Sequence, residues 1–222
     1  LFGPAEARFT GRVAWRATVP AGRAPDAALA PATSVWLGPG RHFVHYPVRG
    51  GALVNCVAVV EREDPGEESW SRRGDPAELA AEFAGWHGDV RGLVDAMDPE
   101  TCFQWALFDR DPMPSWRRGR LVLLGDACHP TLPFLAQGAG MAIEDARVLA
   151  NSLAAHEEID EALARYELLR RDRTARIQEE SRRNAAVFHY AGLAAWARNR
   201  ALRRAGHDRL DWLYGYDPVR VV

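Results

Sequence analysis

Apolar and polar residues alternate along much of the first half of the chain. At residues 13–19, every second position is occupied by Val13, Trp15, Ala17 and Val19. Successive side chains of a β-strand point to opposite faces, so this period of two predicts a half-buried strand. Similar runs predict further strands over residues 35–37, 42–48, 53–60 and 102–108.

Two of these runs, residues 42–48 and 53–60, flank the sequence Arg49-Gly50-Gly51-Ala52. Glycine accepts the backbone angles that tight turns need, so this arrangement predicts a β-hairpin. The second arm is nearly all apolar, which predicts that it is buried on both faces.

Helical periodicity begins near residue 75 and dominates from residue 140 onward. Asp75-Pro76 is typical of a helix start, and Leu79, Phe83 and Trp86 would share one face of that helix. Further helices are expected over residues 90–97, 140–155, 159–183 and 187–202, with a short buried strand over residues 121–124. The order predicts an α+β or α/β fold, in which a β-sheet with helices precedes one more strand and a helical C-terminal region.

Composition narrows the function classes. The chain has 222 residues and a formal net charge of −2, and it has no run of the roughly 18 apolar residues that a membrane span needs. We therefore expect no nucleic-acid partner and no membrane partner. Three widely spaced cysteines, Cys56, Cys102 and Cys128, do not suit a disulfide framework or a zinc site. They favour a reducing cytoplasm and no bound metal.

The most informative stretch runs from Gly125 to Ala146, GDACHPTLPFLAQGAGMAIEDA. An apolar run stops at Gly125-Asp126, a loop with two prolines follows, and Gly138 and Gly140 open a helical pattern. Unpaired N–H groups and the helix dipole give a helix N-terminus a partial positive charge, and glycine lets the backbone approach a ligand closely. The stretch therefore indicates a site for an oxygen-rich ligand.

This stretch resembles the second flavin-binding motif of the single-component FAD-dependent aromatic hydroxylases, in the branch of the salicylate and 6-hydroxynicotinate monooxygenases. The resemblance implies that Asp126 holds a ribityl hydroxyl of FAD and that Pro133 lies beside the flavin ring and the substrate. It also implies that backbone amides at the helix start face the N1–C2=O edge, where the reduced flavin is negatively charged. The implied cofactor-binding residues are Gly125, Asp126, Pro133, Ala136, Gln137, Gly138, Ala139, Gly140 and Met141.

The segment from Gly40 to Val48 resembles the strand that walls the substrate cavity in this family. His42 and Tyr46 lie four residues apart on one strand face, so the resemblance implies that both contact the aromatic substrate. The alternatives are a half-buried sheet residue for Tyr46 and a surface hydrogen-bond donor for His42. Phe134 replaces a histidine of the hydroxynicotinate-type relatives, which favours a more apolar aromatic substrate. The implied catalytic set is Pro133, Tyr46, His42 and Phe134.

The family also holds the ADP half of FAD with an N-terminal GxGxxG motif, and this chain lacks that motif. We therefore expect a substrate-binding β-sheet domain at residues 1–118 and the C-terminal part of a Rossmann-like FAD-binding domain at residues 119–186. Residues 187–222 are expected to form closing helices. The N-terminal dinucleotide-binding part would be a missing segment that was removed, is disordered or was never encoded.

The resemblance implies a flavin-dependent monooxygenase that hydroxylates a phenol or an aromatic acid, with NADH or NADPH and O2 as cosubstrates. The cofactor would carry the redox chemistry, and the protein would position it and exclude water. One alternative is a non-catalytic fragment that acts only as a binding or assembly module, and another is a related halogenase or oxidase. The Trp- and Tyr-rich tail at residues 212–216 leaves a homodimer open.

Other polar residues have simpler interpretations. Cys128-His129 has no third catalytic member nearby in the sequence, so His129 is expected to be structural. Glu144 and Asp145 lie one turn into the predicted helix and are expected to favour its dipole. A basic cluster in the next helix is interleaved with acidic residues, which predicts a solvated helix face formed by Arg170, Arg171, Arg173, Arg176, Arg182 and Arg183.

Overall fold

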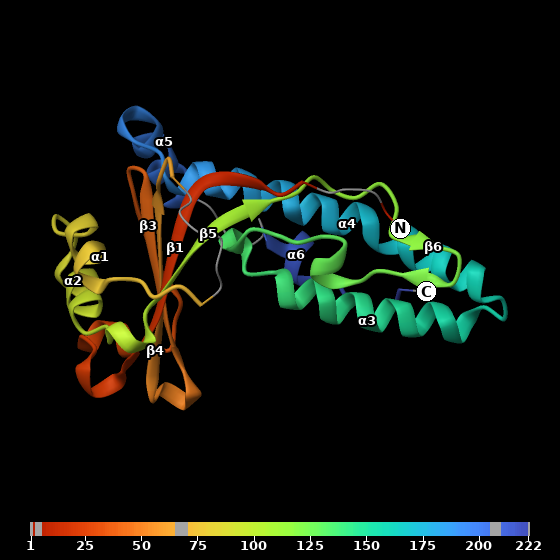
Figure 1. Ribbon diagram of the computed structural model, residues 1–222, viewed down its shortest axis with the longest axis horizontal. Coiled ribbons are helices and arrows are strands. Elements are labelled where there is room, and N and C mark those ends of the chain that lie inside the picture. The colour runs from red at the N-terminus through yellow and green to blue at the C-terminus, as the bar shows by residue number, and fades with distance from the viewer. Residues whose placement is uncertain (1, 3–5, 65–70, 205–209, 222) are drawn as a thin grey trace. The chain divides into compact units, whose positions relative to one another are not determined.

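A computed structural model describes residue 2 and residues 6–64, 71–204 and 210–221. The chain forms two compact units (Figure 1). The sheet unit comprises Phe9–Leu107 and Phe188–Trp196, and the helical unit comprises Leu1–Arg8, Phe108–Val187 and Ala197–Val222. Each unit therefore combines segments that are far apart in the sequence.

A five-stranded sheet with the order β2-β3-β4-β1-β5 forms the frame of the sheet unit. The pairs β2–β3, β3–β4 and β4–β1 are antiparallel. This confirms the predicted antiparallel sheet, since each expected strand is present. The strands are β1 (Arg8–Pro20), β2 (Ser34–Gly38), β3 (Arg41–Val48), β4 (Leu53–Glu61) and β5 (Phe103–Asp109).

The predicted hairpin joins β3 to β4. Arg49, Gly50 and Gly51 all have positive φ, at 51°, 65° and 89°. Two glycines in the left-handed region avoid the Cβ strain that other residues would meet there, so the Gly-Gly pair allows the tight reversal. The hairpin sets the register in which His42 lies opposite Val59 and Tyr46 opposite Asn55.

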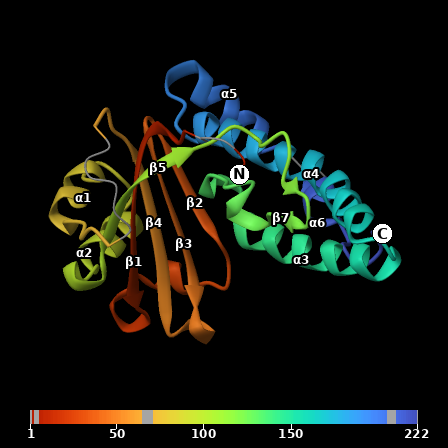
Figure 2. The same cartoon turned by 45° about the vertical axis from the view of Figure 1, so that its right-hand side comes forward.

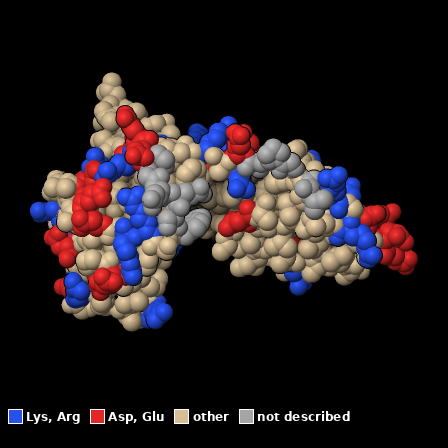
Figure 3. All heavy atoms as spheres, in the orientation of Figure 1, with Lys and Arg blue, Asp and Glu red and all other residues tan. Residues whose placement is uncertain are grey.

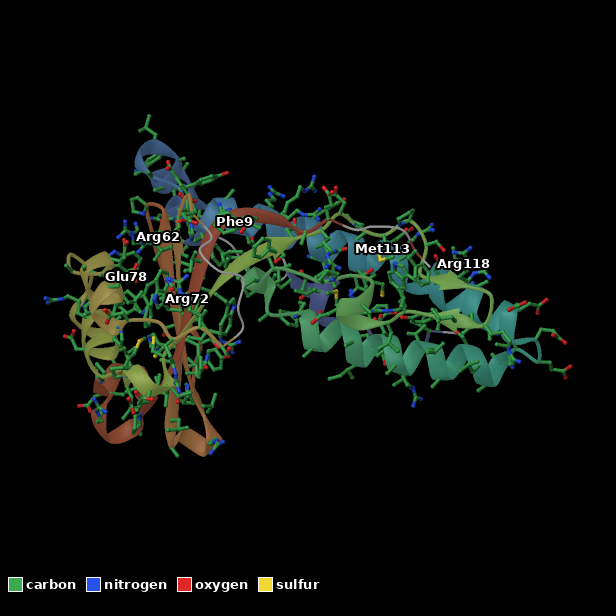
Figure 4. The ribbon with its side chains drawn as sticks, in the orientation of Figure 1. Phe9, Arg62, Arg72, Glu78, Met113 and Arg118 are labelled. Atoms are coloured by element: carbon green, nitrogen blue, oxygen red, sulfur yellow. The ribbon has the colours of Figure 1, made fainter. Side chains whose placement is uncertain are left out.

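One face of the sheet packs against α1 (Pro76–Glu82) and α2 (Gly88–Asp95), as Figures 1 and 2 show. Asp75 caps α1, because its side chain accepts a hydrogen bond from the Ala77 N–H at 2.8 Å. At the same edge of the unit, Arg62 and Glu78 are paired at 2.8 Å (Figure 4). The core between sheet and helices is apolar and includes Trp15, Phe43, Cys56, Ala58, Leu79, Phe83 and Leu93.

Two details of the helix prediction were wrong. Helix α1 ends at Glu82, so Trp86 lies beyond it and packs edge-on against Phe83 with ring centroids 4.7 Å apart. Helix α2 begins at Gly88, two residues before the predicted start at residue 90. Trp86 therefore reaches the core from a turn instead of from a helix, as do Ala96 and Met97 beyond the end of α2 at Asp95, and apolar spacing alone does not distinguish the two cases.

The second face of the sheet is less completely covered. Along β4, Val54, Cys56 and Ala58 are fully buried, whereas Asn55 and Val57 on the other face are half-buried. The predicted burial of this strand on both faces is therefore only partly correct. Its last residues, Val59 and Val60, are the part where both faces are buried.

The helical unit is built around α3 (Gly138–Ala155) and α4 (Ile159–Phe188), which run side by side in Figures 1 and 2. A two-stranded sheet of β6 (Arg117–Arg118) and β7 (Leu121–Val122) precedes them. Helix α3 starts two residues earlier than predicted, and the strand expected over residues 121–124 is only two residues long. Short 3-10 turns complete the chain at Ala21–Arg23, Asp26–Leu29, Arg49–Gly51, Pro99–Thr101, Gly125–Ala127 and Pro133–Leu135.

The expected helix over residues 187–202 is interrupted. Helix α4 continues to Phe188, and α5 (Gly192–Leu202) begins only after a break. Gly192 has a φ of 53°, in the left-handed region that glycine favours, which marks the interruption. The break places His189 outside regular helix, where its backbone carbonyl accepts a hydrogen bond from the Gly40 N–H at 3.1 Å.

The aromatic tail packs mainly on its own chain. Leu213 of α6 (Asp211–Tyr214) is buried in a cluster with Met141 and Ile177. Two arginines of α4 lie over tail aromatics, Arg173 at 4.0 Å from the Tyr216 ring and Arg176 at 3.9 Å from the Trp212 ring. The tail therefore serves the helical unit itself, and the homodimer stays a prediction.

Basic and acidic side chains are intermixed on the surface in Figure 3, and neither sign covers that face continuously. Among the residues that the structure describes, no helix is long and apolar enough to cross a bilayer. In the same residues, no three metal-ligating side chains gather into a possible metal site. The three cysteines are free and buried.

Candidate functional site

The start of α3 is shaped by three special backbone positions. Gly125 has a φ of 60°, and a Cβ there would lie 3.2 Å from the Cβ of Ala142. A 3-10 turn at Pro133–Leu135 follows, and Ala136 adopts the left-handed region with a φ of 53°. For a residue other than glycine this conformation is uncommon and is held by its surroundings. These constraints favour a single backbone conformation for the loop that leads into α3.

The N-terminus of α3 is available to a ligand. No side chain caps it, and its first turn contains no acidic residue. Asp126, Pro133, Ala136 and Ala139 are exposed around it. Its leading N–H groups have no intrahelical acceptor, so an acceptor from a ligand would complete them. This end of the helix combines free donors with a partial positive charge.

Asp126 lies beside this helix start. Its Oδ1 is 3.9 Å from the position that a Cβ on Gly138 would take. The carboxylate thus faces the same space as the first residues of α3, although the two are twelve residues apart in the sequence. A carboxylate accepts hydrogen bonds from hydroxyl groups, whereas the helix start donates them. The structure brings together the two kinds of group that the motif predicted.

A largely buried network of charged side chains supports the loop before α3. The Asp145 carboxylate accepts hydrogen bonds from the Gly125 N–H at 2.9 Å, His129 Nε2 at 2.5 Å and Arg170 Nε at 2.7 Å. Arg170 also pairs with Glu144 at 2.7 Å, and Glu144 pairs with Arg173 at 2.8 Å. The network joins the loop, α3 and α4 through charge-assisted bonds, which are stronger than neutral ones.

The electrostatics of this network keep Asp145 ionised. Burial alone would raise the pKa of Asp145, but the interactions with His129, followed by the hydrogen bonds from Arg170 and the Gly125 amide, outweigh burial and lower the pKa below its ordinary value. A buried carboxylate with these partners is a fixed negative charge. It holds the Gly125 amide in place.

A row of polar side chains on α4 fixes the proline-rich part of the loop. Gln178 Nε2 donates to the Pro130 carbonyl at 2.9 Å, and Ser181 Oγ donates to the Leu132 carbonyl at 2.7 Å. Asn184 Nδ2 donates to the Phe134 carbonyl at 3.3 Å, so the three donors recur every three residues along one helix face. We call Gln178, Ser181 and Asn184 the loop clamp. Each of these three donors bonds to one carbonyl, and the three carbonyls belong to alternate residues of the loop.

Sequence reasoning missed both the network and the clamp. Arg170 is fully buried and Arg173 nearly so, which corrects the interpretation of the basic cluster as a solvated helix face. Asp145 is also fully buried and serves the network instead of the helix dipole. A signal for the clamp was present, because Gln178, Ser181 and Asn184 have the i, i+3, i+6 spacing of one helix face. Nothing in the sequence marked the carbonyls they meet.

The structure supports a structural role for His129 and gives no support to a reactive thiol beside it. His129 is buried and bonded to Asp145 at 2.5 Å. Burial, with the nearby charge of Asp145, raises the pKa of the Cys128 thiol to about 12. The reactive form of cysteine is the thiolate, so this residue is inert near neutral pH.

In the sheet unit, His42 is buried, which excludes the surface-donor alternative. Its Nδ1 lies 2.8 Å from His189 Nε2, and His189 Nδ1 lies 3.0 Å from Glu61 Oε1. Glu61 in turn pairs with Arg12 at 3.1 Å. Burial, followed by the charges of His189 and Arg12, lowers the pKa of His42 to about 3, so the ring is neutral near pH 7.

The remaining predicted residues lie where strand and loop geometry place them. Tyr46 is half-buried on the second face of the sheet, with Val44 and His42 on the same face and Phe43 and His45 on the other. Phe134 belongs to the helical unit, where its side chain is buried. Pro133 next to it is exposed. The structure therefore brings Tyr46 and His42 to one face of one unit, and Pro133 and Phe134 to the loop before α3 of the other.

Comparisons with known proteins agree on one family. A family described as "FAD binding domain" matches residues 26–181. The chain is 42% identical to the 3-amino-4-hydroxybenzoate 2-monooxygenase PtnB3 of Streptomyces platensis, over 96% of this chain and 54% of that protein. It is 37% identical to the 3-hydroxybenzoate 6-hydroxylase of Polaromonas naphthalenivorans strain CJ2, over 95% of this chain and 53% of that protein.

Solved structures give the same result. A salicylate hydroxylase in its substrate complex superimposes with a TM-score of 0.81 at 28% identity, covering 97% of this chain and 56% of the other. The chain thus spans about half the length of the relatives it matches. These relatives bear out the resemblance found in the motif at Gly125–Met141. The chain belongs to the FAD-binding-domain family that includes the flavin-dependent aromatic hydroxylases.

Proposed function

We propose that this chain is the substrate-binding and flavin-ring-facing part of a flavin-dependent monooxygenase that hydroxylates a small aromatic compound. The observation that carries the proposal is the uncapped N-terminus of α3 with the Asp126 carboxylate beside it. Hydrogen-bond donors and an acceptor at one place suit the N1–C2=O edge and the ribityl hydroxyls of FAD. The relatives named for aromatic hydroxylation support the proposal.

The residues present fit this cofactor. The helix start consists of Gly138, Ala139 and Gly140, whose small size lets the backbone come close to a planar ring. A Cβ on Gly138 would lie in ordinary van der Waals contact with Thr131 and Asp126, at 3.7 and 3.9 Å, so these two side chains line the space beside the helix start. The proposed cofactor-binding residues are Gly125, Asp126, Pro133, Ala136, Gln137, Gly138, Ala139, Gly140 and Met141.

The chain's own contribution is positioning. When bound, FAD supplies the chemistry that inserts one atom of O2 into the substrate, with electrons from NADH or NADPH. The amides of α3 stabilise negative charge at the flavin edge, and Asp126 orients the ribityl chain. The loop clamp and the Asp145 network hold Pro133 and the helix start in place. Preorganised donors of this kind cost no rearrangement during the reaction.

The proposed substrate is a small aromatic acid or phenol. Tyr46 on the second sheet face offers a ring and a hydroxyl, and we assign it to substrate contact. His42 is buried and bonded to His189, so we assign it to positioning within the sheet unit. Phe134 is proposed as a specificity residue, because it offers an apolar ring where a histidine would offer hydrogen bonds. The enzyme is proposed to be cytoplasmic, in accord with its three free cysteines.

In functional terms, we propose residues 1–118 as the substrate domain, residues 119–186 as part of the FAD domain and residues 187–222 as closing helices. The ADP-binding part would be a separate segment that packs on the helical unit. Helix α3 presents an apolar stripe of Ala139, Ile143, Ala146, Ala150 and Leu153, in which Ile143 is 70% exposed. Such a stripe on one helix face normally packs against another element. We assign this packing role to the part of the relatives that this chain does not span.

The assignment of the flavin edge can be tested by nuclear magnetic resonance. FAD is titrated into the isotopically labelled chain, and the backbone amides of Gly138, Ala139 and Gly140 are followed. We expect these three amides to shift most, and the Asp126→Ala variant to weaken FAD binding at least tenfold, because a charge-assisted bond is lost. An exposed carboxylate of the other unit, Asp26, gives a matched control as Asp26→Ala.

Two outcomes of this titration contradict the assignment. In one, FAD binds but shifts other amides and leaves Gly138–Gly140 unchanged. In the other, Asp126→Ala and Asp26→Ala bind FAD equally. A chain that binds FAD but supports no hydroxylation when the part of PtnB3 that it does not match is supplied would favour the alternative of a non-catalytic binding or assembly module. Hydrogen peroxide or halogenated product without hydroxylation would instead favour an oxidase or a halogenase.

A further inference from the structure

The C-terminal tail, residues 210–221, packs against the start of α3. Leu213 of α6 belongs to one buried apolar cluster with Met141 of α3 and Ile177 of α4. Leu135, in the turn before α3, packs against the same cluster. Met141 and this turn are part of the proposed flavin site. The end of the chain therefore supports residues of that site.

One arginine of α4, Arg173, joins this tail to α3. Its Nε and Nη2 donate to the two carboxylate oxygens of Glu144 at 2.9 and 2.8 Å, which is the bidentate geometry of a strong charge-assisted pair. Its Nη1 and Nη2 also donate to the Trp212 and Leu213 carbonyls at 3.1 and 2.9 Å. A single guanidinium thus binds a side chain of α3 and the backbone of the tail at the same time.

An aromatic ring and burial hold this guanidinium in place. Arg173 Cζ lies 4.0 Å from the centre of the Tyr216 ring, and the Arg173 side chain is only 10% exposed. A planar guanidinium can lie over an aromatic ring while its edge donates hydrogen bonds. A lysine ammonium carries the same charge but has neither the plane nor the fork of donors, so it cannot make all of these contacts together. The site is therefore specific for arginine.

The tail also has attachments that do not involve Arg173. Arg176 of α4 lies over the Trp212 ring at 3.9 Å. Asn151 Nδ2 of α3 lies within hydrogen-bond distance of three tail carbonyls, at 3.2, 3.3 and 3.0 Å from those of Pro218, Val219 and Val221. A change at Arg173 should therefore loosen α6 locally without releasing the whole tail.

We propose that Arg173 is a positioning residue of the flavin site, which couples the C-terminal tail to the start of α3 and to the turn before it. The inference rests on the proposed function and adds that the site depends on the end of the chain. Bound to Glu144 and to the tail carbonyls, Arg173 keeps Leu213 against Met141 and Leu135. The amides at the start of α3 are then held in the geometry that suits the N1–C2=O edge.

The first readout is amide hydrogen exchange of the full chain without flavin. Arg173→Lys keeps the charge and removes the fork, and Arg183→Lys, at a largely exposed arginine of the same helix, is the matched control. The probes are the amides of Ala136 and Met141, which are both hydrogen-bonded. Arg173→Lys should accelerate exchange at both about fivefold or more, because local opening becomes easier. The hydrogen-bonded Leu123 amide, elsewhere in the helical unit, should keep its rate.

The second readout is the nuclear magnetic resonance of bound FAD labelled with 13C at C2, which reports hydrogen bonding to the C2=O group. In the unaltered chain and in Arg183→Lys, this resonance should be displaced from its position in free FAD. In Arg173→Lys at saturating FAD, it should return about halfway or more towards that position, because hydrogen bonds weaken steeply when their geometry changes. A residue that only stabilises the fold would leave the resonance of the saturated complex unchanged.

Tyr216→Leu tests the coupling from the tail. It should produce the same two effects more weakly, and add nothing in the Arg173→Lys background, because the ring acts through the guanidinium. Additive effects overturn the coupling. Faster exchange with an unchanged resonance assigns Arg173 to fold stability alone and also overturns the proposal. If Arg173→Lys matches Arg183→Lys in both readouts, the proposal fails while the proposed function stands. A C2 resonance that stays at its free position in the unaltered chain contradicts the proposed function itself, and this inference with it.

Discussion

The sheet unit and the helical unit bury different kinds of side chain. Most buried side chains of the sheet unit are apolar, with Trp15, Phe43 and Phe83 among them, although His42, His45, Gln104 and His189 are buried there too. The helical unit instead encloses Asp145, Arg170 and their charged partners beneath the loop that leads to α3. Apolar packing is non-directional, whereas buried charge pairs act only in one geometry. The contrast indicates that the helical unit is built to hold particular backbone atoms in place, and the sheet unit to supply a surface.

The largest expected effect comes from Arg170→Met. It leaves the buried Asp145 carboxylate without its guanidinium partner, which should destabilise the helical unit by about 3–5 kcal/mol. Hydrogen exchange should show faster opening of α3 and α4, while the amides of β3 and β4 keep their protection. The surface variant Arg183→Met is the control, because Arg183 is largely exposed.

A second variant makes this prediction specific to charge. Asp145→Asn in the Arg170→Met background should recover part of the lost protection, because a neutral amide costs less to bury than an unpaired carboxylate. If Arg170→Met opens both units equally, or if Arg183→Met has the same effect, then the charged network is not what distinguishes the helical unit.

The second-largest expected effect is a loss of stability of the sheet unit at low pH. The folded-state pKa of His42 is about 3, below the roughly 6.5 of an unfolded histidine. The unfolded chain therefore binds the proton first, so the stability from neutral His42 is present above about pH 6.5 and is lost as the pH falls towards 3. Between pH 6.5 and 5 this should remove about 2 kcal/mol from the sheet unit.

His42→Phe should remove that pH dependence. Its stability relative to the unaltered chain should improve as the pH falls from 7 to 5, as measured by protection of the β3 and β4 amides. A difference between the two proteins that does not vary with pH would show that His42 is not the titrating group.

The comparison also separates what the sequence predicts from what it does not. Period-two alternation identified β1 and the β3–β4 hairpin, and the Gly-Gly pair marked its turn. Those features depend on residues that are close together in the sequence, so the sequence is sufficient to predict them. The cover that buries His42 comes from His189, which is 147 positions away, and the clamp joins α4 to carbonyls 48 to 50 positions earlier. Contacts of that range leave no periodic signal in a single sequence.

The candidate site shows the same division. The motif predicted that Asp126 and the glycines of α3 would lie together, because strand, loop and helix are consecutive. The predicted role of Asp145 was wrong. Its position near a helix start suggested an interaction with the helix dipole, whereas its partners, His129 and Arg170, come from other elements. Helix periodicity places a residue on a face, and tertiary packing decides what that face meets.

The smallest effect tests the loop clamp. Ser181→Ala removes the 2.7 Å bond to the Leu132 carbonyl and leaves that acceptor only the long 3.5 Å bond from Thr131 Oγ1, which should cost about 1 kcal/mol. Exchange of the loop amides at Ala136 and Cys128 should accelerate, with little change elsewhere. Thr33→Ala, at an exposed hydroxyl of the sheet unit, should leave the exchange rates as they are. Equal exchange in the two variants would mean that Ser181 does not hold the loop.

The measurement that tests the central claim most directly is product analysis under 18O2. The chain is combined with the part of PtnB3 that it does not match, FAD, NADH or NADPH, and 3-hydroxybenzoate or salicylate, and the product is analysed by mass spectrometry. The account predicts a ring-hydroxylated product with one 18O atom per molecule, formed in smaller amount by Asp126→Ala. Bound FAD and consumed NADH or NADPH without 18O in any aromatic product would contradict it.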